Sequence, residues 1–127
     1  MKNDIADRSD VETLVDTFYA KVQENEVLGY IFNDVANVDW VHHLPKMYSF
    51  WASILLGEHS FSGNPMIKHV ELSKITPITE ATFIEWLSLF IETVDGLFEG
   101  VVAEEAKTRA ATIARIMLSK IQLVQIA

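Results

Sequence analysis

The sequence contains no cysteine and is poor in basic residues. Without cysteine the chain cannot form disulfides, thiolate zinc sites or iron–sulfur clusters, and it has no cysteine nucleophile. Any metal must therefore be bound by histidine or carboxylate groups. Lysine and arginine together number 10 against 18 acidic residues, and the net charge of −8 opposes binding to phosphate backbones and anionic membrane surfaces. We therefore expect neither nucleic acid nor a membrane as a partner.

Long apolar runs and glycine-rich motifs are also missing. No uninterrupted apolar stretch approaches the roughly 20 residues of a membrane span. The first residues, MKNDIADRSD, lack the apolar core of a signal peptide, so we expect a cytoplasmic protein. Neither a phosphate-binding glycine-rich loop nor a hydrolase nucleophile elbow is present. Half of the 127 residues are apolar, which predicts one folded domain covering residues 1–127.

Apolar residues recur with helical spacing along the chain, and this pattern predicts an all-α protein. Ser9 and Glu12 match a capping box, so a first helix should begin at Ser9 and end near Asn25. A short helical corner should follow at residues 27–34, broken at Gly29. Four more helices are expected: one from Asp39 to Gly57, one of two turns starting at Asn64 and Pro65, one from Thr79 to Gly100, and one from about residue 102 to residue 126.

The two-turn helix carries His69, one of only four histidines, within the stretch NPMIKHVEL. Isolated helices shorter than about 12 residues are marginal in water, so a helix this short needs an external anchor. A bond from His69 to a metal would supply one. A large apolar cofactor would also explain why phenylalanine, tryptophan and methionine crowd the inward faces of the other helices. The alternative is that these side chains are ordinary core residues.

Two neighbouring histidines, His42 and His43, lie near the start of the third expected helix. His43 shares a helical face with Trp40 and Met47, which are apolar, whereas His42 shares its face with Lys46. We therefore expect His43 to point inward and His42 to face solvent. His59 falls in a loop and is expected at the surface. Pro45 interrupts the backbone hydrogen bonds of this helix and is expected to bend its first turns.

The chain resembles the truncated haemoglobins, and within them the third group, found in bacteria. The resemblance covers nearly the whole chain. The segments that carry it are the Phe18-Tyr19 pair, His43 three residues after Trp40, FWASILLG at 50–57, the histidine of NPMIKH, and EWLSLF at 85–90. Other groups commonly carry Gly-Gly motifs, and this sequence has none. The resemblance implies a truncated globin fold, in which two helices cross over two others and sandwich haem.

The resemblance also implies roles for individual residues around haem b. His69 corresponds to the proximal histidine that binds the iron, with its second ring nitrogen donating to a backbone carbonyl. Tyr19, His43 and Trp86 correspond to the polar residues of the distal pocket. Lys68 and Lys46 are candidates to pair with the haem propionates. The residues implied to contact haem are Phe32, His43, Met47, Phe50, Trp51, Lys68, His69 and Trp86.

The implied function is binding or transport of dioxygen, with carbon monoxide, nitric oxide and cyanide as further ligands. The family is also linked to chemistry with nitric oxide or peroxides, which leaves open an activity like that of a nitric oxide dioxygenase or a peroxidase, supported by a reductase. We expect a monomer. The alternative from another class is a cofactor-free helical interaction module. A di-iron bundle would need Glu-x-x-His motifs on two helices, and the sequence offers only Asp39-x-x-His42.

Overall fold

A computed structural model describes residues 2–35, 39–59 and 79–126 of the chain. Every regular element in these ranges is helical, which confirms the all-α prediction. The elements are α1 (Arg8–Glu24), α2 (Glu26–Gly29), the π-helical η1 (Tyr30–Val35), α3 (Trp40–Leu56), α5 (Glu80–Leu97) and α6 (Val101–Ile126). The two-turn helix predicted from Asn64 lies outside the described residues.

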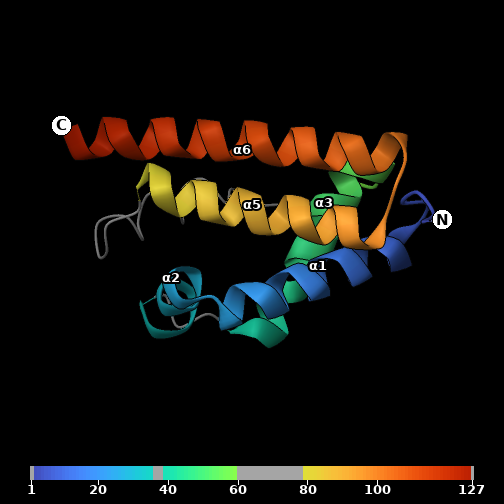
Figure 1. The fold of residues 1–127 in the computed structure, drawn as a ribbon, viewed down its shortest axis with the longest axis horizontal. Coiled ribbons are helices and arrows are strands. Elements are labelled where there is room, and N and C mark those ends of the chain that lie inside the picture. The colour runs from blue at the N-terminus through green and yellow to red at the C-terminus, as the bar shows by residue number, and fades with distance from the viewer. Residues whose placement is uncertain (1, 36–38, 60–78, 127) are drawn as a thin grey trace.

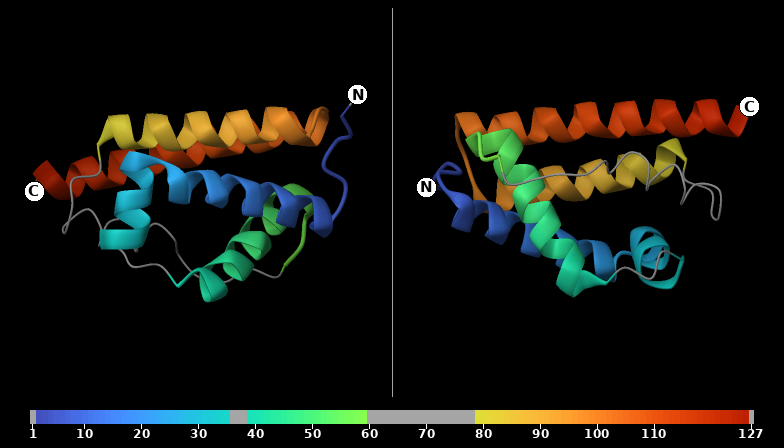
Figure 2. Two further views of the ribbon diagram at one scale, coloured as in Figure 1. Left: turned by 60° about the horizontal axis from the view of Figure 1, so that its bottom comes forward. Right: turned by 180° about the vertical axis from the view of Figure 1, so that it is seen from behind.

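The long helices form two pairs, α1 with α3 and α5 with α6. α1 joins the pairs because it packs against both α3 and α5. α5 and α6 lie side by side and antiparallel, and α1 runs along α5 on the side away from α6 (Figure 1). α3 packs against α1 and crosses it obliquely, as both views in Figure 2 show. This arrangement brings one face of α1 against both α3 and α5.

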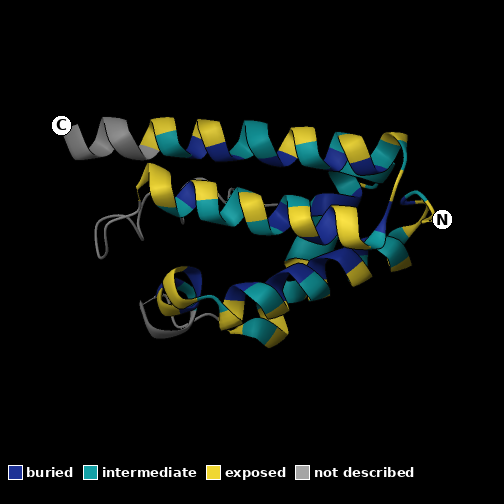
Figure 3. Ribbon diagram, viewed as in Figure 1, coloured by how far each residue is buried: buried dark blue, intermediate teal, exposed yellow. Residues whose placement is uncertain are grey.

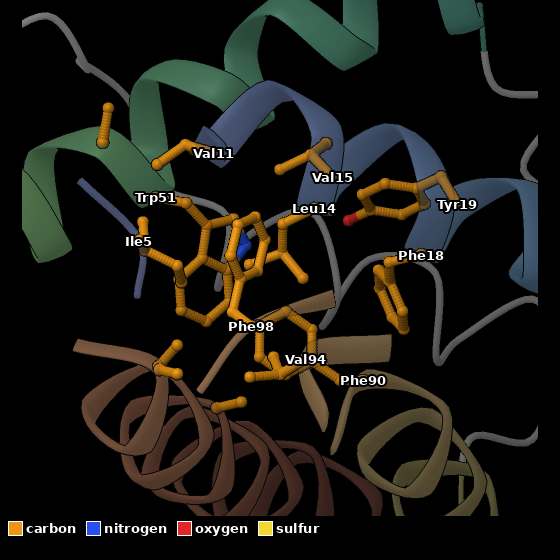
Figure 4. Close-up of a cluster of buried hydrophobic side chains, with 14 of the residues drawn as sticks. Ile5, Val11, Leu14, Val15, Phe18, Tyr19, Trp51, Phe90, Val94 and Phe98 are labelled. Atoms are coloured by element: carbon orange, nitrogen blue, oxygen red, sulfur yellow. The ribbon is translucent and has the colours of Figure 1, made fainter. Parts of the chain in front are cut away.

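The buried residues lie on the faces that the helices turn toward one another (Figure 3). On α1 they recur at helical spacing: Val11, Leu14, Val15, Phe18, Tyr19 and Val22. On α6 the buried positions Ala103, Ala106 and Ala110 are small, which allows close helix packing. Each large apolar side chain that is fully buried stabilises the folded state by about 1.5 to 3 kcal/mol, compared with the same side chain left exposed to water. The core is therefore centred on the inner face of α1 (Figure 4).

The first helix begins at a different residue from the one predicted. Asp7, not Ser9, occupies the N-cap position, and its carboxylate accepts a hydrogen bond of 3.0 Å from the N–H of Asp10. The carboxylate of Asp10 in turn accepts from the N–H of Ala6 at 2.9 Å. The Asp7 carboxylate thus satisfies a free N–H group of the first turn, and the helix begins before Ser9, so the capping box predicted at Ser9 is wrong. The predicted end of the helix at Asn25 is confirmed.

The corner after α1 is built on Asn25 and Gly29. The Asn25 side chain accepts hydrogen bonds from two N–H groups of α2 and donates one of 2.8 Å to the carboxylate of Glu85 on α5. The break predicted at Gly29 is absent, because α2 continues directly into η1. A Cβ atom at Gly29 would lie 2.6 Å from the backbone oxygen of Gln23. Glycine therefore serves close packing of the corner on α1.

The helix ends agree with the sequence at several positions and differ at one. Asp39 stands at the N-cap position of α3, and Gly57 follows that helix in the left-handed conformation at φ 72°. Thr79 caps α5 through a reciprocal pair with Thr82. α5 ends at Leu97, so the prediction that it extends to Gly100 is wrong. The carbonyl of Gly100 instead accepts the first hydrogen bond of α6, from the N–H of Glu104.

Candidate functional site

Four rings from α1, η1 and α3 meet in one group, the Tyr19 cluster, which consists of Tyr19, Phe32, Trp40 and His43. The Tyr19 and His43 rings meet edge to face with centroids 5.5 Å apart. Trp40 lies 5.4 Å from Tyr19, 5.6 Å from His43 and 6.0 Å from Phe32. A phenol and an imidazole are thereby held together in largely apolar surroundings, where hydrogen bonds are stronger than in water.

Tyr19 is only 5% exposed. Burial raises the pKa of its phenol well above the ordinary value, because the phenolate would lose its hydration. The hydroxyl is protonated at neutral pH, as an ordinary phenol is. In Figure 4 the Tyr19 ring lies beside Phe18 on α1, with its oxygen on the side where Leu14 and Val15 are drawn. Tyr19 can consequently act as a hydrogen-bond donor to a molecule in this part of the protein.

The two neighbouring histidines take the orientations predicted from the helical pattern. The side chain of His42 is 80% exposed, and its Nδ1 lies 2.6 Å from the carboxylate of Asp39. This interaction holds the pKa of Asp39 below its ordinary value. His43 is partly buried and contacts the rings of Tyr19 and Trp40. The inward assignment of His43 is confirmed, and so is the exposed position predicted for His59.

Phe18 connects the Tyr19 cluster to α5. Its centroid lies 4.9 Å from that of Tyr19 and 5.7 Å from that of Trp86, both in edge-to-face contacts. Trp86 in turn stacks on Phe90 at 5.8 Å, and Trp51 stacks on the same ring at 4.7 Å. Tyr19 and Trp86, which come from different helices, therefore both contact one buried phenylalanine.

The remaining predicted contact residues divide by exposure. Trp51 is 2% exposed and belongs to the hydrophobic core, where its contact with Phe90 accounts for it as packing. Phe32, Met47, Phe50 and Trp86 pack against the core but stay only partly buried. Lys46 is exposed on α3. Lys68 and the predicted iron ligand His69 lie outside the described residues.

Two residues of this region were not among the predicted site residues. Trp40 contacts all three other members of the Tyr19 cluster, although the sequence suggested only that it shares a face with His43. Asn25 fixes the corner that leads to Phe32 by its bond to Glu85. The sequence did indicate Trp40, because a residue three positions before an inward histidine lies next to it on the same helical face. The Asn25 contact spans 60 residues, and no local pattern indicates it.

Comparison with known proteins identifies the family. The model of the family described as bacterial-like globin matches residues 3–121. The chain belongs to the bacterial-like globins. Within them it falls among the group III truncated haemoglobins, since it is 32% identical over 117 residues to a group 3 truncated haemoglobin of Campylobacter jejuni, covering 90% of each chain.

Solved globin structures agree with this assignment. The crystal structure of the group III truncated haemoglobin from Campylobacter jejuni superposes with a TM-score of 0.82 at 31% identity, covering 95% of each chain. The truncated oxygen-avid haemoglobin from Bacillus subtilis gives a TM-score of 0.70 at 26% identity, covering 88% of this chain and 93% of that one. The fold is therefore a truncated globin fold, and the globin is a haem-based gas-binding protein.

The described part of this globin fits haem in two respects. Large apolar side chains on η1, α3 and α5 stay partly uncovered beside a fully buried core, which suits a flat apolar ligand. Next to them the phenol of Tyr19 and the imidazole of His43 offer polar groups in a poorly hydrated region. None of the helices in the described ranges has the length and apolar character needed to cross a membrane.

Proposed function

We propose that this globin would hold haem b through His69 and that Tyr19, His43 and Trp86 would control the diatomic ligands of the haem. The observation that carries the proposal is the edge contact between the buried Tyr19 phenol and His43 at 5.5 Å. The absence of cysteine excludes c-type attachment of haem, which uses cysteine thiols, and so favours the b type. The metal ligand and the distal roles follow from the family resemblance.

Haem supplies an iron that binds dioxygen, carbon monoxide, nitric oxide or cyanide and shifts electron density onto dioxygen. The residues of the chain then determine how long the ligand stays. The Tyr19 phenol is protonated at neutral pH, and burial raises its pKa further, so it can donate toward a partly negative atom. The Trp86 indole, which also contacts Phe18, is a second N–H donor. His43, which is only partly buried, would close the entrance between these groups and solvent.

Strong donors around the ligand favour slow release, and slow release suits chemical reaction better than transport. We therefore propose chemistry with nitric oxide or peroxides, supported by a reductase that restores the ferrous iron. We further propose a cytoplasmic monomer, with residues 1–127 forming one domain. Lys46 is exposed on α3, where it is available to pair with a haem propionate, as proposed for Lys68 as well.

The experiment that tests the proposal is haem titration of the purified protein with absorption spectroscopy. We expect a Soret band that saturates at one haem per chain, and loss of most haem affinity in His69→Ala with recovery on adding imidazole. His59→Ala is the matched control, since His59 is exposed and should leave the spectrum unchanged. A colourless protein that takes up no haem would favour the interaction module. An unchanged ferrous spectrum in His69→Ala without imidazole would mean that another residue binds iron.

A further inference from the structure

Trp40 contacts every other ring of the Tyr19 cluster and, like Tyr19, lies against both Phe32 and His43. Its indole packs against Tyr19 from α1, stacks on Phe32 from η1 at an angle of 27°, and meets His43 edge to face at 79°. We propose that Trp40 is a positioning residue that holds the His43 ring against Tyr19 and thereby limits how readily ligands pass His43. This proposal rests on the proposed function for its effect on ligands, although the ring geometry can be tested without them.

The position of Trp40 in the helix explains why its ring can have this effect. Trp40 is the first residue of α3, and His43 follows three residues later on the same face. The indole therefore fills the space beside the imidazole on the side of η1 and α1. With a smaller side chain at residue 40, that space opens and the imidazole can rotate away from Tyr19. Because His43 is only partly buried, the core does not enclose it on every side.

The first turn of α3 is also held by hydrogen bonds to Asp39, which do not depend on Trp40. The carbonyl of Asp39 accepts hydrogen bonds from the N–H groups of His42 and His43, and the carboxylate of Asp39 binds the His42 ring at 2.6 Å. These contacts do not involve the indole. Replacement of Trp40 should therefore leave the turn in place and release only the inward ring of His43.

The first test is nuclear magnetic resonance of protein with labelled histidine rings, in the haem-loaded carbon monoxide form. With four histidines in the chain, the ring signals can be assigned by single substitutions. We expect Overhauser contacts between the His43 and Tyr19 rings in the wild type and their loss in Trp40→Leu. Val41→Ala is the control, because Val41 is 79% exposed in the same turn and should preserve the contacts. If Trp40→Leu keeps the contacts, the proposal is wrong.

The second test measures carbon monoxide association in a double-mutant cycle. Loss of one aromatic contact of this kind changes an equilibrium constant or a rate constant by roughly two- to tenfold. We therefore expect Trp40→Leu to speed association by about three- to tenfold. In a His43→Ala background the same substitution should change it by less than about twofold, because the group on which Trp40 acts is gone. An equal effect in both backgrounds would show that Trp40 acts by general loosening, and would overturn the proposal.

Two further measurements apply if the Trp40→Leu variant does not fold or if the protein binds no haem. If Trp40→Leu does not fold, Trp40→Phe replaces it in the cycle, and a change below about twofold with His43 present contradicts the proposal. If the protein binds no haem, the proposed function fails, but the contacts between the His43 and Tyr19 rings can still be measured in the colourless protein. Failure of the positioning role and failure of the haem site are therefore separate results.

Discussion

The carboxylate of Asp4 accepts a hydrogen bond of 2.8 Å from the backbone N–H of Ala103, 99 residues further along the chain. Its second oxygen accepts another, of 3.0 Å, from the N–H of Val102. Asp4 thus satisfies the first turn of α6, whose N-cap position is occupied by Gly100, a residue without a side chain. A Cβ atom at Gly100 would lie 2.4 Å from Asp4 Cγ, so the glycine leaves room for a cap supplied by the N-terminal segment.

The first prediction is that Asp4→Ala lowers the free energy of unfolding by about 1 to 2 kcal/mol at pH 7, as loss of a helix cap does. Asp4→Asn is the matched control, because an amide oxygen can still accept from the N–H groups of α6, and it should lose less. Urea denaturation of the three proteins measures the difference. Equal stability of wild type and Asp4→Ala would mean that water replaces the carboxylate at no cost.

The Asp4 contribution should also depend on pH. Burial by itself raises the pKa of Asp4, but hydrogen bonds from Val102, Ala103 and Ile5 outweigh it and hold the pKa below its ordinary value. A depressed carboxyl pKa stabilises the folded state above the unfolded pKa of about 3.9. This contribution is lost as the pH falls through the folded pKa. The stability difference between wild type and Asp4→Ala should therefore shrink below about pH 4.

The second prediction compares two helical glycines that differ in their surroundings. A Cβ at Gly29 would meet the backbone oxygen of Gln23 at 2.6 Å, whereas a Cβ at Gly96 would have no neighbour within 4 Å. Gly29→Ala should lower the free energy of unfolding by about 1 to 3 kcal/mol, since backbone must move. Gly96→Ala should raise it by roughly 0.5 to 1 kcal/mol, because alanine favours the helix. Thermal or urea unfolding measures both, and changes of the same sign would contradict the packing described for Gly29.

The sequence predicted features that depend on helical periodicity. It separated His43 from His42 correctly, because adjacent helical residues point about 100° apart and their neighbours at three and four positions differ in polarity. It placed the C-terminal ends of α1 and α3 and the start of α5 within one residue of their caps. These features are local, so the residues that decide them stand next to one another in the chain.

Features that depend on contacts between distant segments were not predicted. The Asp4 cap on α6 exists only because the fold brings residue 4 to residue 102. The start of α1 was misplaced because Asp7 and Ser9 are comparable caps two residues apart, and the bond from the Asp10 N–H to the Asp7 carboxylate favours the earlier one. Similarly, the contact of Trp40 with Phe32 joins α3 to η1, and no local pattern indicates it. The role of His69 remains a prediction.

The third prediction tests the proposed role of Tyr19 as a hydrogen-bond donor to the ligand. Tyr19→Phe removes one hydroxyl and keeps the ring contacts with Phe18, Trp40 and His43, so the packing of the pocket should persist. A hydrogen bond to a group carrying charge contributes about 1.5 to 3 kcal/mol. If Tyr19 donates to dioxygen, the release of dioxygen should be roughly 10- to 100-fold faster from Tyr19→Phe than from the wild type. Stopped-flow measurement of dioxygen dissociation from the ferrous protein gives this rate directly.

Carbon monoxide and Trp86 supply the controls for this prediction. Carbon monoxide carries much less negative charge on the iron than dioxygen, so its release from Tyr19→Phe should change by far less. Trp86→Phe should act in the same direction as Tyr19→Phe on dioxygen. The two effects need not add, because in the proposed arrangement both donors would act on one ligand. If dioxygen release is unchanged in both variants and in the double variant, Tyr19 and Trp86 are packing residues, and the pocket does not discriminate ligands by charge through them.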